Sequence, residues 1–185
     1  MKQHYEEYRY GNLGFDGSRV SVFCLGLGGA TVGPGPKCIS DHLPKILERR
    51  HPSVVYLHIG ENDFRLSHHQ HPSVVASQIT DMVKHMSSHV PVVYVSQLLS
   101  FAAAAEQKDS IIECNNYLKV PCQNVDTVQF WHHRGLWNQP VSLMTEGPRR
   151  NVFDSQGVHL SQEGQKLYWH SVRVAVHPES RQHLG

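Results

Sequence analysis

Short runs of β-branched and aromatic residues recur along the chain, and their length and composition predict β-strands. The predicted strands cover residues 19–25, 53–59, 90–95 and, with a weaker pattern, 127–130. The second and third runs are apolar at nearly every position, whereas a strand with one exposed face alternates apolar and polar residues. We therefore expect these two runs to be buried on both faces, as strands of a parallel sheet are.

The segments between these runs carry apolar residues at helical spacing. This spacing predicts helices over residues 40–50, 74–86, 111–118 and 161–176. Ser161 is a suitable N-cap for the last helix, because its hydroxyl can accept a hydrogen bond from an amide of the first turn. Strands that alternate with helices are typical of βαβ units, so we expect a layered α/β fold. A single domain over residues 1–176, followed by a C-terminal tail over 177–185, fits the length of 185 residues.

Composition and charge narrow the classes of function. Seventeen basic and sixteen acidic residues give a formal net charge of +1, so the chain lacks the basic excess that charge-driven nucleic-acid binding needs. No apolar run approaches the ~20 residues of a membrane span, and the first residues lack the apolar segment of a signal peptide. We therefore expect a soluble, intracellular protein without a nucleic-acid or membrane partner.

Histidine is unusually frequent, with fifteen residues that include clusters at 68–71 and 132–133. One interpretation is a metal site, and the other is a set of polar surface loops. Neither cluster has the i, i+4 spacing or the carboxylate partner that zinc enzymes use. The four cysteines contain no C-x-x-C pair. We therefore expect no metal and no cofactor, and a metalloenzyme stays open as an alternative.

Three loops are expected to share one edge of the sheet, where ligands bind in such folds. They cover residues 26–31, 60–64 and 153–160. The glycines of the first loop let a backbone amide approach a ligand closely, and Asn62 adds a side-chain amide, so together they could hold a developing negative oxygen. His159 could act as a general base. Each feature also has an ordinary alternative: a common turn, a helix cap and an exposed loop histidine.

The order and the amino-acid sequences of the three loops resemble sequence blocks of the SGNH (GDSL-type) hydrolases. The blocks read Gly28-Gly29-Ala30-Thr31, Gly60-Glu61-Asn62-Asp63 and Gly157-Val158-His159-Leu160-Ser161. The resemblance is closer to an esterase-like branch of animal proteins that is often associated with retrotransposons. Residues 58–63 read H-I-G-E-N-D, as in that branch, and residues 130–137 match its aromatic-histidine segment. The resemblance covers about residues 12–176.

This resemblance implies a three-layer, flavodoxin-like parallel sheet with helices on both faces and a Ser-His-Asp hydrolytic site. It also implies that the backbone amide of Gly29 and the side-chain amide of Asn62 form an oxyanion hole. His159 would be the catalytic base. Asp63 is expected to brace the Asn62 loop rather than take part in the chemistry. Further support for the site is expected from Gly28 and Gly60.

Two positions of the family's triad are not filled. The family nucleophile is a serine directly after a first strand, upstream of the glycine block, and this sequence has no such strand or turn there. Ser18 precedes a predicted strand, so we assign it to a turn, and the nucleophile remains unknown. Gln156 stands where the family has its aspartate, with Asp154 as a weak substitute. Loss of the comparable charge costs serine proteases about 10⁴ in turnover, so we expect weak or no ester hydrolysis.

The absent first strand also matters for the fold. In the flavodoxin-like strand order it lies between the strands predicted at 19–25 and 53–59. Without it, both would have unpaired backbone groups, at roughly 1–3 kcal/mol for each buried group. Either the two strands pair directly, or the isolated chain is marginally stable. We therefore expect a fragment, such as a truncated gene product or a splice variant.

Four functions stay open on the sequence. The first is an ester hydrolase that, if active, works as a serine esterase on small acyl esters. The second is a noncatalytic binding or assembly module, for which a retrotransposon origin stays open. The third is nucleic-acid association, and the fourth is a metalloenzyme. The long connection over residues 131–156 is expected to form one wall of any pocket, with Trp131 and Trp137 as apolar surfaces.

Overall fold

The computed structural model describes residues 12–65, 70–99, 105–134, 136 and 152–177. The helices of these residues are α1 (Leu43–Arg50), α2 (Pro72–Ser87), α3 (Ala105–Gln123) and α4 (Gln162–Val176). The strands are β1 (Val54–Leu57), β2 (Val92–Ser96) and β3 (Val128–Trp131). Two short 3₁₀ helices, η3 (Ile39–Asp41) and η4 (Glu61–Phe64), complete the described elements. The predicted α/β class is confirmed, as are the four helices and three of the four strands.

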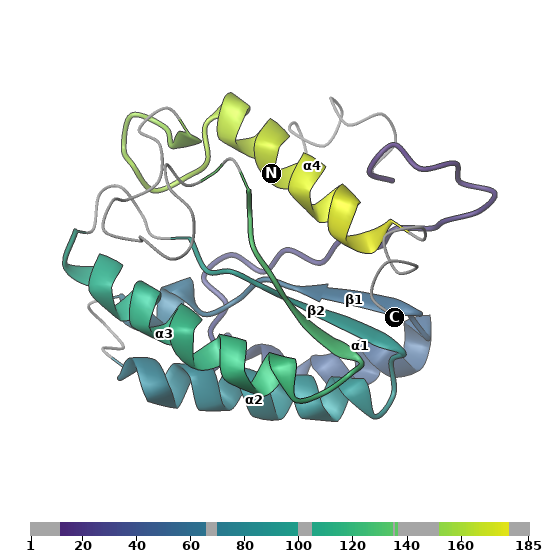
Figure 1. Ribbon diagram of the computed structural model, residues 1–185, viewed down its shortest axis with the longest axis horizontal. Helices are drawn as coiled ribbons and strands as arrows, with labels where there is room; N and C mark the ends of the chain where they lie inside the picture. The colour runs from purple at the N-terminus through teal and green to yellow at the C-terminus, as the bar shows by residue number, and fades with distance from the viewer. Residues whose placement is uncertain (1–11, 66–69, 100–104, 135, 137–151, 178–185) are drawn as a thin grey trace.

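The three strands form one parallel sheet in the order β1-β2-β3 (Figure 1). Val54 of β1 lies opposite Val92 of β2, and Val93 of β2 lies opposite Val128 of β3. The central strand β2 is buried, whereas β1 is only half-buried along its whole length. The expected burial on both faces therefore holds for the 90–95 run but not for β1. The outer edge of β1 has no strand beside it in the described chain.

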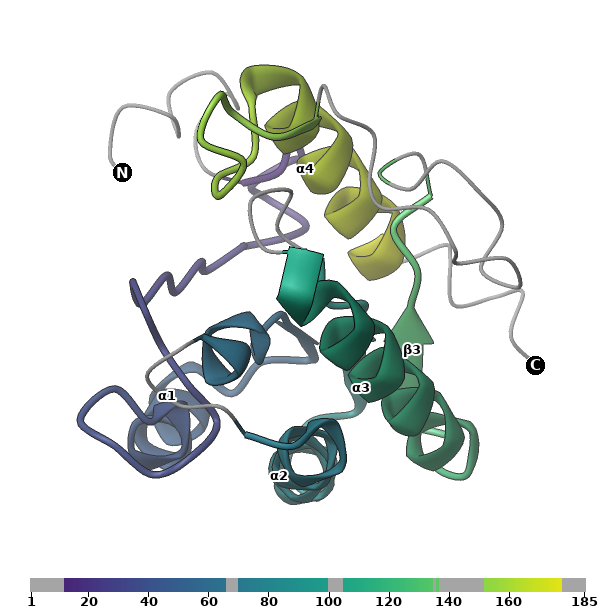
Figure 2. The same ribbon diagram turned by 90° about the vertical axis from the view of Figure 1, so that its left-hand side faces the viewer.

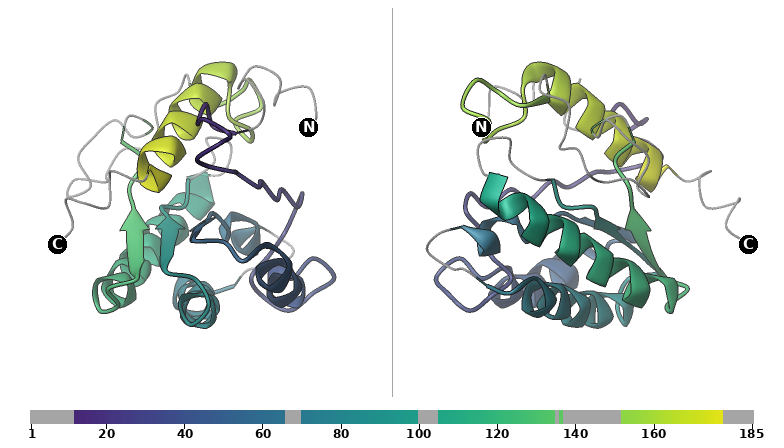
Figure 3. Two further views of the ribbon diagram at one scale, coloured as in Figure 1. Left: turned by 90° about the vertical axis from the view of Figure 1, so that its right-hand side faces the viewer. Right: turned by 60° about the vertical axis from the view of Figure 1, so that its left-hand side comes forward.

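Helices cover both faces of the sheet. Helices α1, α2 and α3 lie on one face, and α4 crosses the other (Figures 2 and 3). The main core lies between the sheet and the helices α2 and α3. Its side chains are at most 1% exposed at Ile79, Met86, Val93, Ile111 and Leu118. This three-layer arrangement is consistent with a flavodoxin-like fold that lacks one strand.

The prediction of a strand over residues 19–25 is wrong. These residues cross the molecule without regular secondary structure and pair with no strand among the described residues. The side chains of Phe23 and Leu25 are 51% and 47% exposed. The guanidinium of Arg50 lies 4.1 Å from the centre of the Phe23 ring. The residue types favour a strand, but a strand needs a neighbour for its backbone hydrogen bonds, and β1 does not come close enough to supply one.

Helix α4 is fixed to the loop that precedes it. The Ser161 hydroxyl accepts a hydrogen bond from the Gly164 amide at 3.1 Å, so Ser161 is the N-cap that the sequence predicts. A side chain on Gly164 would collide with the backbone carbonyl of Val152. Glycine at this position therefore lets the helix approach the loop closely. Among the described residues, no helix combines the length and the apolar character that crossing a membrane would require.

Candidate functional site

An open cavity of about 1110 Å³ lies beside β1. The strand β1, the irregular segment 20–27 and side chains of α1 and α4 line it. The lining also brings together four residues that the sequence analysis singles out: Gly29, Gly60, Asn62 and His159. These four come from three separate loops. The cavity runs along the whole of β1, and Gly60 and Asn62 line it just beyond the carboxyl end of the strand, where parallel-sheet proteins bind ligands. Four other predicted residues are not part of the lining: Gly28, Asp63, Asp154 and Gln156.

The glycine loop presents a backbone amide beside a positive charge. Gly29 has a φ of +75°, a conformation that favours glycine. Its amide makes no hydrogen bond to any described residue, so it can donate to a ligand. Lys37 donates from its Nζ to the Gly28 carbonyl at 2.9 Å, and a Cβ on Gly29 would lie 3.1 Å from that ammonium. The sequence analysis did not single out Lys37, whose charge would favour an anion at this loop.

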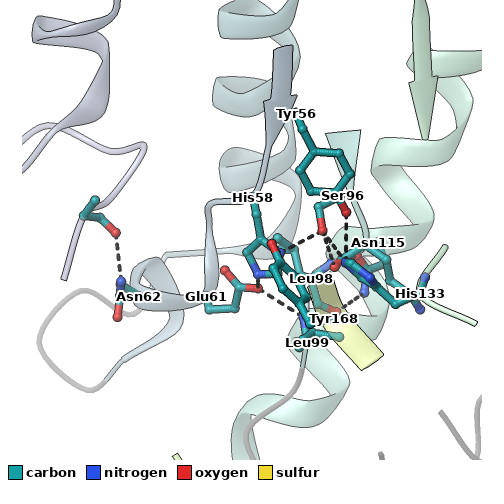
Figure 4. A network of polar contacts seen from close by, with 12 residues as sticks. Tyr56, His58, Glu61, Asn62, Ser96, Leu98, Leu99, Asn115, His133 and Tyr168 are labelled. Atoms are coloured by element: carbon teal, nitrogen blue, oxygen red, sulfur yellow. Dashed lines mark hydrogen bonds and ion pairs between the residues drawn. The ribbon is translucent and has the colours of Figure 1, made fainter. Parts of the chain in front are cut away.

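Asn62 lies on η4, directly after β1. Its Nδ2 donates to the Ala30 carbonyl at 2.9 Å, which ties η4 to the glycine loop (Figure 4). A side-chain amide has two donor hydrogens, so one remains for a ligand. The bond to Ala30, the residue that follows Gly29, brings Asn62 close to the Gly29 turn, and both residues line the cavity.

Asp63 holds the loops that carry Gly29 and Asn62 together, and its side chain does not line the cavity. The side chain is fully buried, and its carboxylate accepts from the backbone amides of Val32 at 3.1 Å and Gly33 at 3.0 Å. It also accepts from Gln70 Nε2 at 3.0 Å. Each of these bonds joins η4 to another loop. Asp63 thereby holds the Asn62 loop against the glycine loop.

His159 is exposed, and among the described residues no side chain makes a hydrogen bond to its ring. Oδ1 of Asp154 accepts the backbone amides of Gln156 at 3.1 Å, Val158 at 3.2 Å and His159 at 3.4 Å. This carboxylate therefore shapes the loop and does not bond to the imidazole. The side chain of Gln156 is exposed and makes no hydrogen bond to the imidazole either. Neither candidate for the acid position thus acts on His159 in this structure.

The described serines include none whose hydroxyl contacts the His159 ring. Ser18 forms a local turn in which Asp16 Oδ1 accepts from the Ser18 amide at 2.9 Å and from its hydroxyl at 2.8 Å, in line with its assignment to a turn. Ser155 is exposed in the 154–157 turn. Ser67 and Trp137 lie outside the described residues. Trp131 does not form the expected pocket wall, because its indole donates to the Ser171 hydroxyl of α4 at 3.0 Å.

A polar network that the sequence analysis missed lies at one wall of the cavity (Figure 4). Its members His58, Glu61 and Tyr168 line the cavity, whereas Ser96 and His133 do not. Ser96, at the end of β2, has its hydroxyl 2.8 Å from His58 Nδ1 and 2.8 Å from His133 Nε2. His58 Nε2 contacts the Glu61 carboxylate at 2.5 Å, and the Tyr168 hydroxyl of α4 lies 3.0 Å from His58 Nδ1. The network therefore joins the carboxyl ends of the strands to α4.

Ser96, His58 and Glu61 have the connectivity of a hydrolase triad, but their position rules out direct attack on a substrate. Ser96 is 1% exposed and does not line the cavity. Its hydroxyl is surrounded by the two imidazoles and the Gln97 carbonyl. In this structure the three residues bind one another and stabilise the end of the sheet.

Burial and neighbouring charges together set the protonation of Glu61 and His133 in this network. Burial raises the pKa of Glu61, but the charge of His58, the hydrogen bond from His58 and the backbone amides outweigh it, so the pKa lies below its usual value. Burial lowers the pKa of His133 to about 3, and repulsion from His58 and His132 adds to this effect. Glu61 is therefore charged and His133 neutral at pH 7.

One signal in the sequence could have revealed this network. His58 follows the β1 run, Ser96 ends the β2 run and His133 follows the β3 run, so three polar residues stand at the carboxyl ends of three neighbouring parallel strands. In the motif at residues 58–63, the sequence analysis assigned a role to Asn62 and none to His58. His132 and His133 were considered as a metal cluster, as a polar surface loop and as part of the aromatic-histidine segment, but not as partners of a strand-end network. No group of three His, Cys, Asp or Glu side chains in the described part of the chain is arranged to hold a metal ion.

Comparison of the chain with protein-family models, curated proteins and solved structures gives no match. The resemblance to the SGNH hydrolases therefore rests on the three sequence blocks.

Proposed function

We propose that this chain is an SGNH-hydrolase-like domain that retains the anion-binding side of an ester-hydrolase site and has weak or no hydrolytic activity by itself. The supporting observation is that Gly29, Asn62 and His159, which lie far apart in the sequence, line one cavity beside β1. A free backbone amide, a side-chain amide and an imidazole are the groups that an acyl-transfer site needs besides its nucleophile.

In this proposal each residue has a limited role. The amides of Gly29 and Asn62 bind the carboxylate, phosphonate or carbonyl oxygen of a ligand, and Lys37 favours negative charge there. His159 is placed to accept a proton, but no carboxylate of the described residues bonds to its ring or stabilises its protonated form. An oxyanion site without an attacking group leaves only a residual rate, on the order of 10³–10⁴ over water in serine proteases. We therefore propose binding with slow turnover at most.

The catalytic part of the proposal is tested with a short-chain aryl ester. We expect the purified protein to hydrolyse it at a rate close to that of buffer, and Asn62→Ala to have the same rate. Robust turnover that disappears in Asn62→Ala would contradict the proposal, because it would require an efficient nucleophile.

The binding part has its own test. A short alkyl phosphonate anion is titrated into labelled protein, and the backbone amide signal of Gly29 and the side-chain signal of Asn62 are followed by NMR. We expect both signals to shift with saturable binding, and Asn62→Ala to weaken it. The matched control is Asn116→Ala, an exposed asparagine of α3 far from the cavity, which should bind as the wild type does. An unchanged Gly29 signal would refute the anion site.

A second candidate function is a noncatalytic binding or assembly module. The observation that favours it is the size of the cavity, which extends along β1 well beyond the few residues that an ester group would touch. In this case His159→Ala would leave every function of the chain unchanged, whereas substitutions along β1 would not.

A further inference from the structure

Two exposed histidines lie together at the end of α2. His85 is in the last turn of the helix, and His89 is in the connection to β2. Because α2 ends at Ser87 and β2 begins at Val92, this connection lies at the amino end of the strand, at the opposite edge of the sheet from Asn62 (Figure 1). The pair is therefore separate from the anion site and from the cavity, whose lining includes neither histidine.

The two imidazole rings have the spacing that a shared metal ion requires. Their centres are 4.9 Å apart, and their planes meet at 52°. An ion bonded to one nitrogen of each ring at about 2.0–2.1 Å would lie about 3 Å from each ring centre. For bond angles between about 90° and 109°, as in octahedral and tetrahedral coordination, the ring centres would then be about 4.5–5 Å apart. The observed separation therefore fits one ion between the two rings.

The surroundings of His89 decide which of its nitrogens can bind a metal. Nδ1 of His89 lies 2.9 Å from the His85 carbonyl oxygen and 2.9 Å from the Ser88 hydroxyl oxygen. The Ser88 hydroxyl donates its own proton to the same carbonyl at 2.7 Å. Both neighbours of Nδ1 are therefore acceptors, so Nδ1 carries the ring proton and Nε2 keeps its lone pair. A hydrogen bond from the second ring nitrogen to a backbone carbonyl is how metal-binding histidines are usually oriented.

The rest of the surroundings also suit a cation. The His85 ring makes no hydrogen bond to any described residue, so a lone pair of this ring is free to bind an ion. The last carbonyl groups of a helix carry partial negative charge, which favours a cation at this end of α2. The Lys84 ammonium pairs with the Asp81 carboxylate at 3.5 Å, which offsets its repulsion of a second cation.

We propose that His85 and His89 form a binding site for a divalent transition-metal ion, Zn²⁺ in particular, through Nε2 of His89 and one nitrogen of His85. Imidazole nitrogen suits such ions, whereas Mg²⁺ and Ca²⁺ prefer oxygen ligands. Water fills the other coordination positions, because no group of three His, Cys, Asp or Glu side chains in the described part of the chain could hold the ion. The site is therefore exchangeable, unlike a structural zinc site with four protein ligands.

This proposal differs from the expectation of no metal that the sequence analysis reached. That expectation considered the histidine clusters at 68–71 and 132–133, which lack the i, i+4 spacing of helical metal ligands. His85 and His89 have this spacing. They do not form a run of adjacent histidines, so the clustering of histidines in the sequence did not indicate them.

NMR of the imidazole nitrogens tests the site directly. Zn²⁺ is titrated into the isotope-labelled full chain, and the ring-nitrogen signals of His85 and His89 are followed. We expect saturable shifts of His89 Nε2 and one His85 nitrogen with a Kd of about 100 µM or tighter, while His89 Nδ1 keeps its proton. Zn²⁺ binding that leaves both rings unchanged, or no binding at all, would overturn the proposal. Equal shifts with Mg²⁺ would also overturn it, because they would show a general charge effect.

Matched variants then show whether the two rings share one ion. His85→Ala and His89→Ala should each weaken Zn²⁺ binding at the remaining ring at least about tenfold, because each ring holds the ion at a high effective concentration for the other. Both side chains are exposed, so the fold should be retained, which circular dichroism checks. The control is His170→Ala, which removes a single exposed histidine of α4 and should bind Zn²⁺ at the pair as the wild type does. Wild-type affinity of the remaining ring, or an equal loss in His170→Ala, would contradict the proposal.

Discussion

Acidification should destabilise the fold through one buried imidazole, that of His133. The side chain is 2% exposed, and its ring nitrogens contact Ser96, Tyr56 and Ser171. Burial lowers the pKa of His133 from 6.5 to about 3, so the folded protein keeps it neutral when the unfolded chain already binds a proton. Stability is therefore fully present above pH 6.5 and falls as the pH drops from there toward 3.

The expected size follows from the two pKa values. One unit of pKa difference corresponds to about 1.36 kcal/mol, so lowering the pH from 7.5 to 5 should cost about 2 kcal/mol through His133 alone. This is a large part of a typical total stability of about 5–15 kcal/mol. Glu61 does not contribute in this range, because its pKa lies below the usual 4.5 and its effect appears only at lower pH. Burial also lowers the pKa of the half-buried His132, so protonation of this residue adds to the loss of stability at low pH.

Urea unfolding at a series of pH values measures this effect. The key comparison is His133→Gln, which keeps hydrogen-bonding groups near Ser96 but does not titrate. We expect the free energy of unfolding of the wild type to fall by about 2 kcal/mol more than that of His133→Gln between pH 7.5 and 5. The matched control is His159→Gln, which removes an exposed imidazole and should keep the wild-type slope. Parallel curves for the wild type and His133→Gln would refute the buried, neutral state of His133.

Two further predictions concern the loops around the site. Gly164→Ala should lower the free energy of unfolding by about 1–3 kcal/mol, because the new methyl group collides with the Val152 carbonyl. The control is Gly17→Ala, which should have little effect because nothing lies within 4 Å of the new methyl group. Equal losses of stability in thermal unfolding would contradict the close approach of α4. Asp63→Asn should lower the free energy of unfolding by about 1.5–3 kcal/mol, because a buried carboxylate that accepts from two backbone amides loses its charge. The control Asp81→Asn, on the surface of α2, should lower it by under about 0.5 kcal/mol. Wild-type stability of Asp63→Asn in urea would show that the carboxylate does not hold the loops together.

The apolar pattern was sufficient to predict most of the fold. The run at 90–95 becomes the central strand β2, and the helical spacing at 161–176 becomes α4 with Ser161 as its cap, because local preference and tertiary packing agree in both places. The run at 19–25 has the same residue types and yet forms no strand. Strand formation depends on a pairing partner, and a partner cannot be read from the segment itself.

The candidate site could be predicted only in part. Gly29, Asn62 and His159 do line one cavity, which follows from the rule that strand ends share one edge of a parallel sheet. Neither residue considered for the acid position bonds to the imidazole: the Asp154 carboxylate accepts from the amides of its own loop, and the Gln156 side chain is exposed. Loop geometry of this kind depends on a few hydrogen bonds that no sequence pattern specifies. The Ser96 network, by contrast, has a signal in the sequence, because polar residues stand at or just after the carboxyl ends of three neighbouring strands, but the G-x-N-D motif was interpreted through Asn62 alone.

A serine-reactive fluorophosphonate, followed by intact-protein mass measurement, tests most directly whether an attacking group is absent. The account predicts no labelling of the folded chain, because no described serine hydroxyl contacts His159 and Ser96 is buried among two imidazoles. Stoichiometric addition of the phosphonate to one serine, prevented by Asn62→Ala, would contradict it and would show that the chain carries a working nucleophile.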